Sequence, residues 1–215
     1  HTASILGCKL NGPQFSADFS FPQQEFKDSV NENTRLIVLI NPNNPTGTSI
    51  SLDQIEDLLK SFSGIPVLVD EAYFEFTGET CISLLSSYSN LIVIRTFSKA
   101  LALPSLRLGY VISSQEFILE LQKIRGPYDV NLAAVLAARE QLNQPEHWQK
   151  MVSSLMNECK PAIERYFDEN HVRYFPSNAN FMLVEPPDAQ QACKFLMDNK
   201  ILVRPMVPPI AHTFR

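Results

Sequence analysis

The chain has 215 residues, of which 45% are hydrophobic and 19% charged, and its formal net charge is −5 at pH 7. This length and composition predict a soluble, folded protein with a sizeable core and room for two domains. The acidic balance and the lack of a basic stripe exclude a general nucleic-acid binder, because such proteins carry an excess of Lys and Arg. No apolar run approaches the roughly 20 residues of a membrane span.

The spacing of the cysteines indicates which cellular compartment to expect. Cys8, Cys81, Cys159 and Cys193 lie far apart and form no C-x-x-C pair, so neither a zinc site nor a disulfide framework is expected. The stretch ILGC at residues 5–8 has no basic and apolar leader before it. We therefore expect reduced thiols, no bound metal, no membrane attachment and a cytoplasmic protein.

Four short apolar runs predict a buried sheet. They are RLIVLI at 35–40, PVLVDE at 66–71, LIVIRT at 91–96 and GYVIS at 109–113. Runs of this kind are typical of parallel strands that are covered on both faces. Between the first two runs, SLDQIEDLLKSF carries a capping-box signal at Ser51 and Gln54 and apolar residues at helical spacing, which predicts a crossover helix.

Helical patterns follow the fourth run. SQEFILELQKI and NLAAVLAAREQL are helical in character, Pro145 interrupts them, and a long helical pattern extends from Glu146 to about residue 170, with Pro161 placed to bend or break it. Beyond it, RYFPSNANFMLVEP and KILVRP resemble strands, and they flank a helix that Asp188 opens. We expect a domain boundary near residue 145, between domains of residues 1–145 and 146–215.

Polar residues gather where three predicted strands end. NPNNPTG at 41–47 forms a rigid, non-helical loop with amide side chains. Asp70 and Tyr73 follow the second strand, and Ser98 and Lys99 follow the third, with Arg107 further on. Open α/β sheets bind ligands at the carboxyl ends of their strands, so the chemistry is expected here.

Taken singly, each feature has an ordinary structural explanation, such as turn chemistry, a helix cap or a surface charge. Together the residue types match one task. A lysine forms an imine with a carbonyl cofactor, and pyridoxal phosphate needs a carboxylate at its ring nitrogen, donors at its phenolate oxygen, and hydroxyls and an arginine at its phosphate. Asp70, Asn44, Tyr73, Ser98 and Arg107 are residues of these types.

The motifs NPNNPTGT, VDEAYFEF, TFSKALALPSLRLGY and PYDVN occur in an order that resembles the fold-type I pyridoxal-phosphate aminotransferases of class I and II, in the histidinol-phosphate aminotransferase-like branch. SNANFMLV and ILVRP resemble the small domain of that family. The resemblance implies an α/β fold, with a three-layer α/β/α large domain built on a mainly parallel sheet and part of a small α+β C-terminal domain.

The resemblance also implies a role for each site residue. Lys99 is the Schiff-base lysine, Asp70 the partner of the pyridine nitrogen, and Asn44 and Tyr73 the ligands of the phenolate oxygen. Ser98 and Arg107 are the phosphate ligands, with Thr96 a weaker candidate. In the substrate site Arg215 matches the arginine that binds the α-carboxylate, Arg204 matches one near the distal group, and Asn44 lies beside them.

Departures from the family pattern are also present. Pro104-Ser105-Leu106 precedes Arg107 where many relatives read Ala-Gly-Leu, so the turn that carries Arg107 departs from the family pattern. The chain begins His-Thr-Ala and ends at AHTFR, so we interpret it as a fragment without the family's N-terminal part and extreme C-terminus. The missing helix N-terminus is a source of phosphate affinity in that family, which predicts weakened cofactor binding.

The activity implied by the resemblance is amino transfer between a donor, with L-histidinol phosphate as the preferred candidate, and 2-oxoglutarate, in a protein that is a homodimer at full length. Two alternatives stay open. A pyridoxal-phosphate decarboxylase of a phosphorylated amino acid, of the threonine-phosphate type, would use the same lysine, aspartate and arginine. A truncated domain without catalysis is the other.

Overall fold

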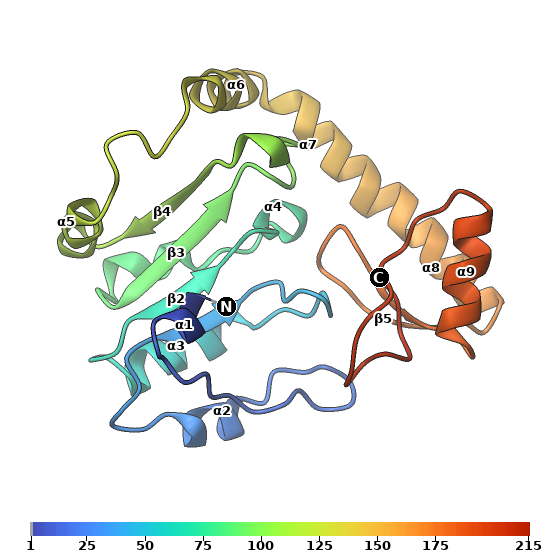
Figure 1. Cartoon of the computed structure of the whole chain (residues 1–215), viewed down its shortest axis with the longest axis horizontal. Helices are drawn as coiled ribbons and strands as arrows, with labels where there is room; N and C mark the ends of the chain where they lie inside the picture. The colour runs from blue at the N-terminus through green and yellow to red at the C-terminus, as the bar shows by residue number, and fades with distance from the viewer. Residues whose placement is uncertain (1) are drawn as a thin grey trace.

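Four strands form the larger sheet of the computed structural model, which describes residues 2–215 (Figure 1). They are β1 (Ile37–Ile40), β2 (Val67–Asp70), β3 (Leu91–Thr96) and β4 (Gly109–Ser113), and they lie in sequence order across the sheet. β1, β2 and β3 are parallel, and Asp70 at the end of β2 pairs with Ile40 and Ile94. The carboxyl ends of three strands therefore meet at one edge.

The prediction of four parallel strands is wrong for β4, which runs antiparallel to β3. The chain returns through residues 97–108 without a crossover helix, and only a crossover would bring it back parallel. Burial on both faces is also wrong for the outer strands. Val38 and Ile40 on β1 and Val111 on β4 are exposed on one face of the sheet, and Tyr110 on β4 is exposed on the other.

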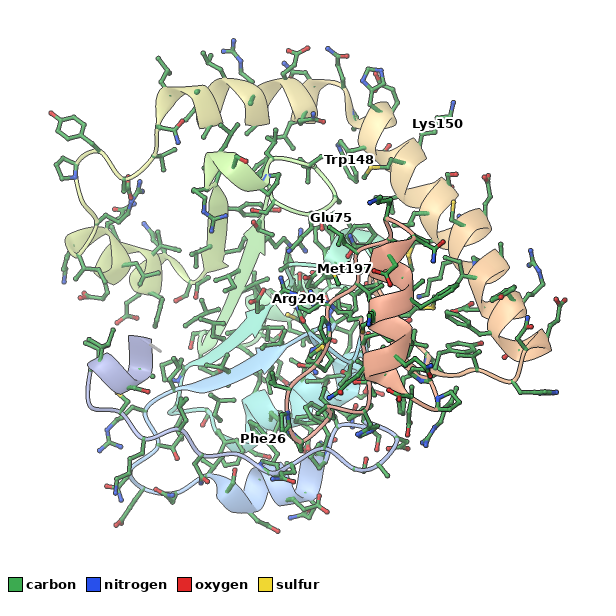
Figure 2. All side chains as sticks on the ribbon, turned by 45° about the vertical axis from the view of Figure 1, so that its right-hand side comes forward. Phe26, Glu75, Trp148, Lys150, Met197 and Arg204 are labelled. Carbon is green, nitrogen blue, oxygen red and sulfur yellow. The ribbon has the colours of Figure 1, made fainter. Side chains whose placement is uncertain are left out.

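The covered face packs on α3 (Leu52–Ser61), which forms where its sequence predicts. The Ser51 hydroxyl accepts from the Gln54 N–H while the Gln54 side chain accepts from the Ser51 N–H, which completes the capping box. Ile55, Leu58 and Leu59 of α3 pack on β1, β2 and β3 in one apolar cluster. Phe26 of α2 (Gln23–Ser29) closes this cluster from below (Figure 2).

Other helices surround the sheet and lead to the second one. They are α1 (Thr2–Ile5), α4 (Phe74–Thr77), α5 (Gln115–Lys123), α6 (Leu132–Asn143) and α7 (Pro145–Ser154), with 3₁₀ turns at η1 (Cys81–Ser86) and η2 (Pro104–Leu106). A second cluster, with Tyr73, Phe76 and Phe97 at its centre, joins α4 to α6 and α7.

α7 continues through a π-helical turn, η3 (Leu155–Cys159), into α8 (Lys160–Glu169), and together they form the long helix at the right of Figure 1. The backbone stays helical from 145 to 169, so Pro161 does not break the helical pattern. Proline lacks the N–H of a regular helical bond, and the wider π turn just before Pro161 accommodates that loss.

A small antiparallel sheet of β5 (Arg173–Phe175) and β6 (Leu183–Glu185) follows, with α9 (Ala189–Asp198) opened by Asp188 as predicted. KILVRP is not a strand, contrary to the prediction. Only an isolated bridge joins Pro205 to Phe214, and Phe214 also bridges Val184. In the described part of the chain, no helix is long and apolar enough to cross a membrane.

Candidate active site

The sites predicted from the three strand ends lie together at the carboxyl edge of the larger sheet. An open pocket of about 290 Å³ lies there, at the lower end of the volumes typical of small-molecule sites. Six of its lining residues come from the ends of β2 and β3 and from the turn after β3: Asp70, Ile94, Arg95, Thr96, Ser98 and Lys99. Ala72 and Arg107 also line the pocket.

Asp70 is the last residue of β2, and its carboxylate reaches this pocket half-buried. One oxygen accepts from the Ala72 N–H at 3.0 Å. Burial raises the pKa of Asp70 above its ordinary value, while the Ala72 N–H and the Lys99 ammonium oppose the rise. A cationic group in the pocket would therefore be favoured beside this carboxylate.

Asn44 and Tyr73 meet beside the pocket from the loops after β1 and β2. The Asn44 Nδ2 donates to the Tyr73 hydroxyl at 3.1 Å. Tyr73 is buried against Phe76, while Asn44 is exposed. The loop holds its shape through its own bonds, in which the Gly47 N–H donates to the Asn43 carbonyl and the Asn43 side chain donates to Thr46.

Thr96, Ser98 and Lys99 occupy the end of β3 and the turn after it. The Thr96 hydroxyl donates to Ser98 Oγ at 2.9 Å and accepts from the Ser98 N–H at 3.1 Å, which fixes both hydroxyls on the pocket wall. The exposed Lys99 ammonium lies 5.3 Å from the centre of the Tyr73 ring. The predicted lysine, carboxylate, hydroxyls and phenol thus share one small space.

Arg107 follows the turn that departs from the family pattern. Pro104–Leu106 forms a 3₁₀ turn, and Arg107 itself takes a left-handed conformation with φ 56° and ψ 45°. Its exposed guanidinium donates to the Pro104 carbonyl at 2.9 Å and still lines the pocket. A guanidinium has five N–H donors, so this bond leaves others available to an anion.

The last residues of the chain bring one of the two predicted substrate arginines to the site. The Arg215 guanidinium donates to the Asn44 Oδ1 and lies over the Phe181 ring at 4.8 Å. Arg204 pairs with Arg215 through backbone bonds of 2.8 and 2.9 Å, and its side chain is exposed (labelled in Figure 2). Neither arginine lines the pocket that holds Lys99.

Three residues at the site, Arg95, Glu71 and Phe181, were not predicted from the sequence. Arg95 in β3 and Glu71 after β2 form a buried ion pair at 2.8 Å, and Glu71 also accepts from the Thr80 hydroxyl and the Cys81 N–H. The only sequence signal is a charged residue in an otherwise apolar strand. Phe181 packs edge-on against Tyr73 at 5.2 Å and carries no signal except its place in SNANF.

Glu75 in α4 is a half-buried carboxylate near Arg95. Its Oε2 has no hydrogen-bond partner within residues 2–215, and the same holds for the Trp148 indole N–H (both labelled in Figure 2). Burial raises the pKa of Glu75 to about 7, with Glu71 adding to the rise and Arg95 opposing it. Among the described residues, no group of three His, Cys, Asp or Glu side chains is arranged to hold a metal ion.

Comparison with known proteins identifies the family. The family model described as aminotransferase class I and II matches residues 8–215. The chain therefore belongs to the class I and II aminotransferases, and the resemblance noted in its motifs is confirmed. The histidinol-phosphate aminotransferase of Caldicellulosiruptor saccharolyticus is 38% identical over 194 residues, which are 87% of this chain and 54% of that enzyme. The chain spans about half the length of the curated relatives it matches.

Two solved structures show the same fold. The histidinol-phosphate aminotransferase of Sinorhizobium meliloti, in complex with pyridoxal-5'-phosphate, gives a TM-score of 0.87 at 24% identity over 99% of this chain and 60% of its own. The L-threonine-O-3-phosphate decarboxylase of Porphyromonas gingivalis gives a TM-score of 0.73 at 25% identity over 86% of this chain and 59% of its own. These likenesses confirm the predicted α/β fold with its mainly parallel sheet.

Proposed function

We propose that this chain carries the chemical centre of a pyridoxal-phosphate-dependent aminotransferase that takes an amino group from L-histidinol phosphate and gives it to 2-oxoglutarate. The observation that carries the proposal is the placement of Lys99 and Asp70 in one pocket, next to the hydrogen-bonded pair of Asn44 and Tyr73. The names of the curated relatives support the choice of donor.

The donor set of the pocket fits this cofactor. Asp70 supplies a carboxylate for a protonated ring nitrogen, and Thr96, Ser98 and Arg107 supply hydroxyls and a guanidinium for a phosphate. When bound, pyridoxal phosphate supplies an electron sink for the bonds at the α-carbon of the substrate.

Each side chain then has one task. Lys99 attaches the cofactor through its amine and, once displaced by the substrate amine, moves the α-proton as general base and then general acid. Asp70 holds the proton at the ring nitrogen, and the positive charge beside it stabilises the ionised carboxylate that burial disfavours. Tyr73 and Asn44 hold the phenolate oxygen through their O–H and N–H groups.

The arginines complete the proposed substrate site. Arg215 binds a substrate carboxylate from a position that Asn44 and Phe181 fix. Arg204, exposed on the neighbouring segment, is proposed for the distal group, the phosphate of the donor or the second carboxylate of the oxo acid. We keep residues 1–145 and 146–215 as the large and small domains of this scheme.

Assembly and compartment belong to the same proposal. Leu132, Val135 and Leu136 of α6 are exposed apolar side chains that suit an interface between two copies in a homodimer. The four cysteines are free thiols, which suits a reducing cytoplasm. Sedimentation with and without pyridoxal phosphate tests the dimer.

The first experiment is covalent trapping. The chain is incubated with pyridoxal phosphate, reduced with borohydride and mapped by peptide mass spectrometry. We expect the label on Lys99, none at exposed Lys60, and no label at position 99 in Lys99→Ala. A folded chain that takes no label at Lys99 would contradict the proposal and favour a domain without catalysis.

The threonine-phosphate decarboxylase of similar fold favours one second candidate, decarboxylation of a phosphorylated amino acid. Product analysis separates the two reactions. Glutamate formed from 2-oxoglutarate supports amino transfer, and carbon dioxide released without an oxo acid supports the decarboxylase.

A further inference from the structure

Lys160 is a buried lysine that the proposed chemistry does not use. It is the first residue of α8, only 9% of its surface is exposed, and its ammonium donates to the backbone carbonyl of Ser177. No carboxylate lies within ion-pair distance of it among residues 2–215, although Glu164 acts on it at longer range. Burial lowers the pKa of Lys160, so the chain tolerates a desolvated amine at this point.

The carbonyl that Lys160 holds belongs to a loop that contacts the loop after β1. Ser177 is buried, and its hydroxyl accepts from the Ala179 N–H at 3.1 Å. Ser177 lies directly against the α-carbon of Gly47, where a β-carbon would collide with its hydroxyl. The Asn178 N–H donates to the Gly47 carbonyl at 2.7 Å, and the Asn178 side chain donates to Ser49 at 2.9 Å.

The loop on the other side of this contact carries Asn44. Its internal bonds make it stiff, and Asn41 ties it to Ile50 through two further bonds of 3.0 and 2.9 Å. A stiff loop passes a displacement of one end to the other. Moving Ser177 would therefore move Asn44, which is bonded to both Tyr73 and Arg215.

Phe181 gives the same loop a second contact with the site. Three residues beyond Asn178, its ring packs against Tyr73 and beneath the Arg215 guanidinium. The segment 177–181 thus touches the loop of Asn44 at one end and the substrate arginine at the other.

We propose that Lys160 is a positioning residue that seats the segment 177–181 on the loop 41–47 and so sets where Asn44 and Arg215 meet the carboxylate of the oxo-acid substrate. The inference rests on the proposed function for the identity of that ligand. The seating of the loop itself is independent of any reaction.

The test compares Lys160→Met, which keeps the apolar stem, with Lys160→Arg, which keeps the charge and the donors. Lys150→Met is the matched control, since Lys150 lies one helix earlier and its side chain is exposed to solvent (Figure 2). Two quantities are measured, the hydrogen exchange of the peptide 176–181 without ligand and the dissociation constant of 2-oxoglutarate from the cofactor-loaded chain. The single tryptophan, Trp148 on α7, reports binding by fluorescence without turnover.

We expect Lys160→Met to raise the exchange rate of the Asn178 and Ala179 amides at least tenfold and to weaken 2-oxoglutarate binding about tenfold. Lys160→Arg should restore both values, and Lys150→Met should change neither. The inference is overturned if Lys160→Met leaves the exchange unchanged, or speeds it while oxo-acid binding stays as in the unaltered chain. An unaltered chain that does not bind the oxo acid refutes the proposed function instead, because the exchange measurement does not depend on it.

Discussion

The side-chain amide of Asn44 uses both of its ends, and Tyr73 takes one of them. The Nδ2 donates to the Tyr73 hydroxyl at 3.1 Å, and the Oδ1 accepts from Arg215. This bonding fixes which way the amide faces, because an exchange of oxygen and nitrogen would place donor against donor at Arg215. The two loops and the last residue of the chain are thereby held in one arrangement.

Tyr73→Phe removes the hydroxyl from this arrangement and keeps the ring. We expect the affinity for pyridoxal phosphate to fall about tenfold, the effect of losing one hydrogen bond of roughly 1–1.5 kcal/mol. Equilibrium dialysis measures the change. Tyr88→Phe is the control, since the Tyr88 hydroxyl donates to Glu56 in α3, and neither residue lines the pocket. Equal effects of the two variants would show that the Tyr73 hydroxyl makes no special contribution.

Glu71→Gln breaks the buried pair with Arg95 and leaves the guanidinium without its charge partner. The free energy of unfolding should fall by about 3–5 kcal/mol, as is usual when one member of a buried pair is removed. Urea denaturation measures it. Asp129→Asn, which breaks the exposed pair with Arg125, should cost at most about 1 kcal/mol. A loss from Glu71→Gln as small as that control would mean that water replaces the pairing.

Glu75 makes stability depend on pH. Its pKa is about 7 in the folded chain against an ordinary value of 4.5, so the folded state binds a proton that the unfolded state has already lost. The stabilisation is complete below about pH 4.5 and is lost as the pH rises to about 7, by an amount on the order of 1–3 kcal/mol. Glu75→Gln should flatten the dependence of the melting temperature on pH across this interval. The same slope in both proteins would assign it to another group.

Gly47→Ala tests the contact between the two loops. Gly47 has a φ of 78°, and a β-carbon there would collide with Ser177. Gly78 has a similar φ of 73° with open space around it, so Gly78→Ala reports the backbone strain alone, about 1 kcal/mol. We expect Gly47→Ala to destabilise by clearly more than Gly78→Ala in thermal unfolding. Equal losses would mean that Ser177 moves aside freely.

Local sequence signals predicted much of the fold. Ser51 and Gln54 predict the start of α3, and three apolar runs predict β1, β2 and β3 close to their observed bounds, because caps and periodicity act over a few residues. The orientation of β4 was predicted wrongly, since an apolar run carries no information on strand direction. KILVRP failed as a strand because no continuous partner strand lies beside it in residues 2–215.

Some residues of the candidate site could be predicted from the sequence, and others could not. Asp70, Ser98 and Lys99 follow directly from strand ends, so topology alone predicts that they meet. The bond of Arg215 to Asn44 joins residues 171 apart, and no local pattern encodes it. Glu75 and Lys160 are hidden for a related reason, since burial of a charged side chain depends on what packs over it.

The π turn at Leu155–Cys159 sets the angular phase of the long helix. In a regular α-helix, residues four apart drift about 40° around the axis, so the steps from Trp148 through Val152 and Met156 to Lys160 would accumulate about 120°. A turn bonded i to i+5 takes more residues per revolution and cancels part of that drift. Lys160 thus stays on the same side of the helix as Trp148, which packs inward. Removing one residue from the π turn would rotate α8 and point the Lys160 ammonium away from Ser177.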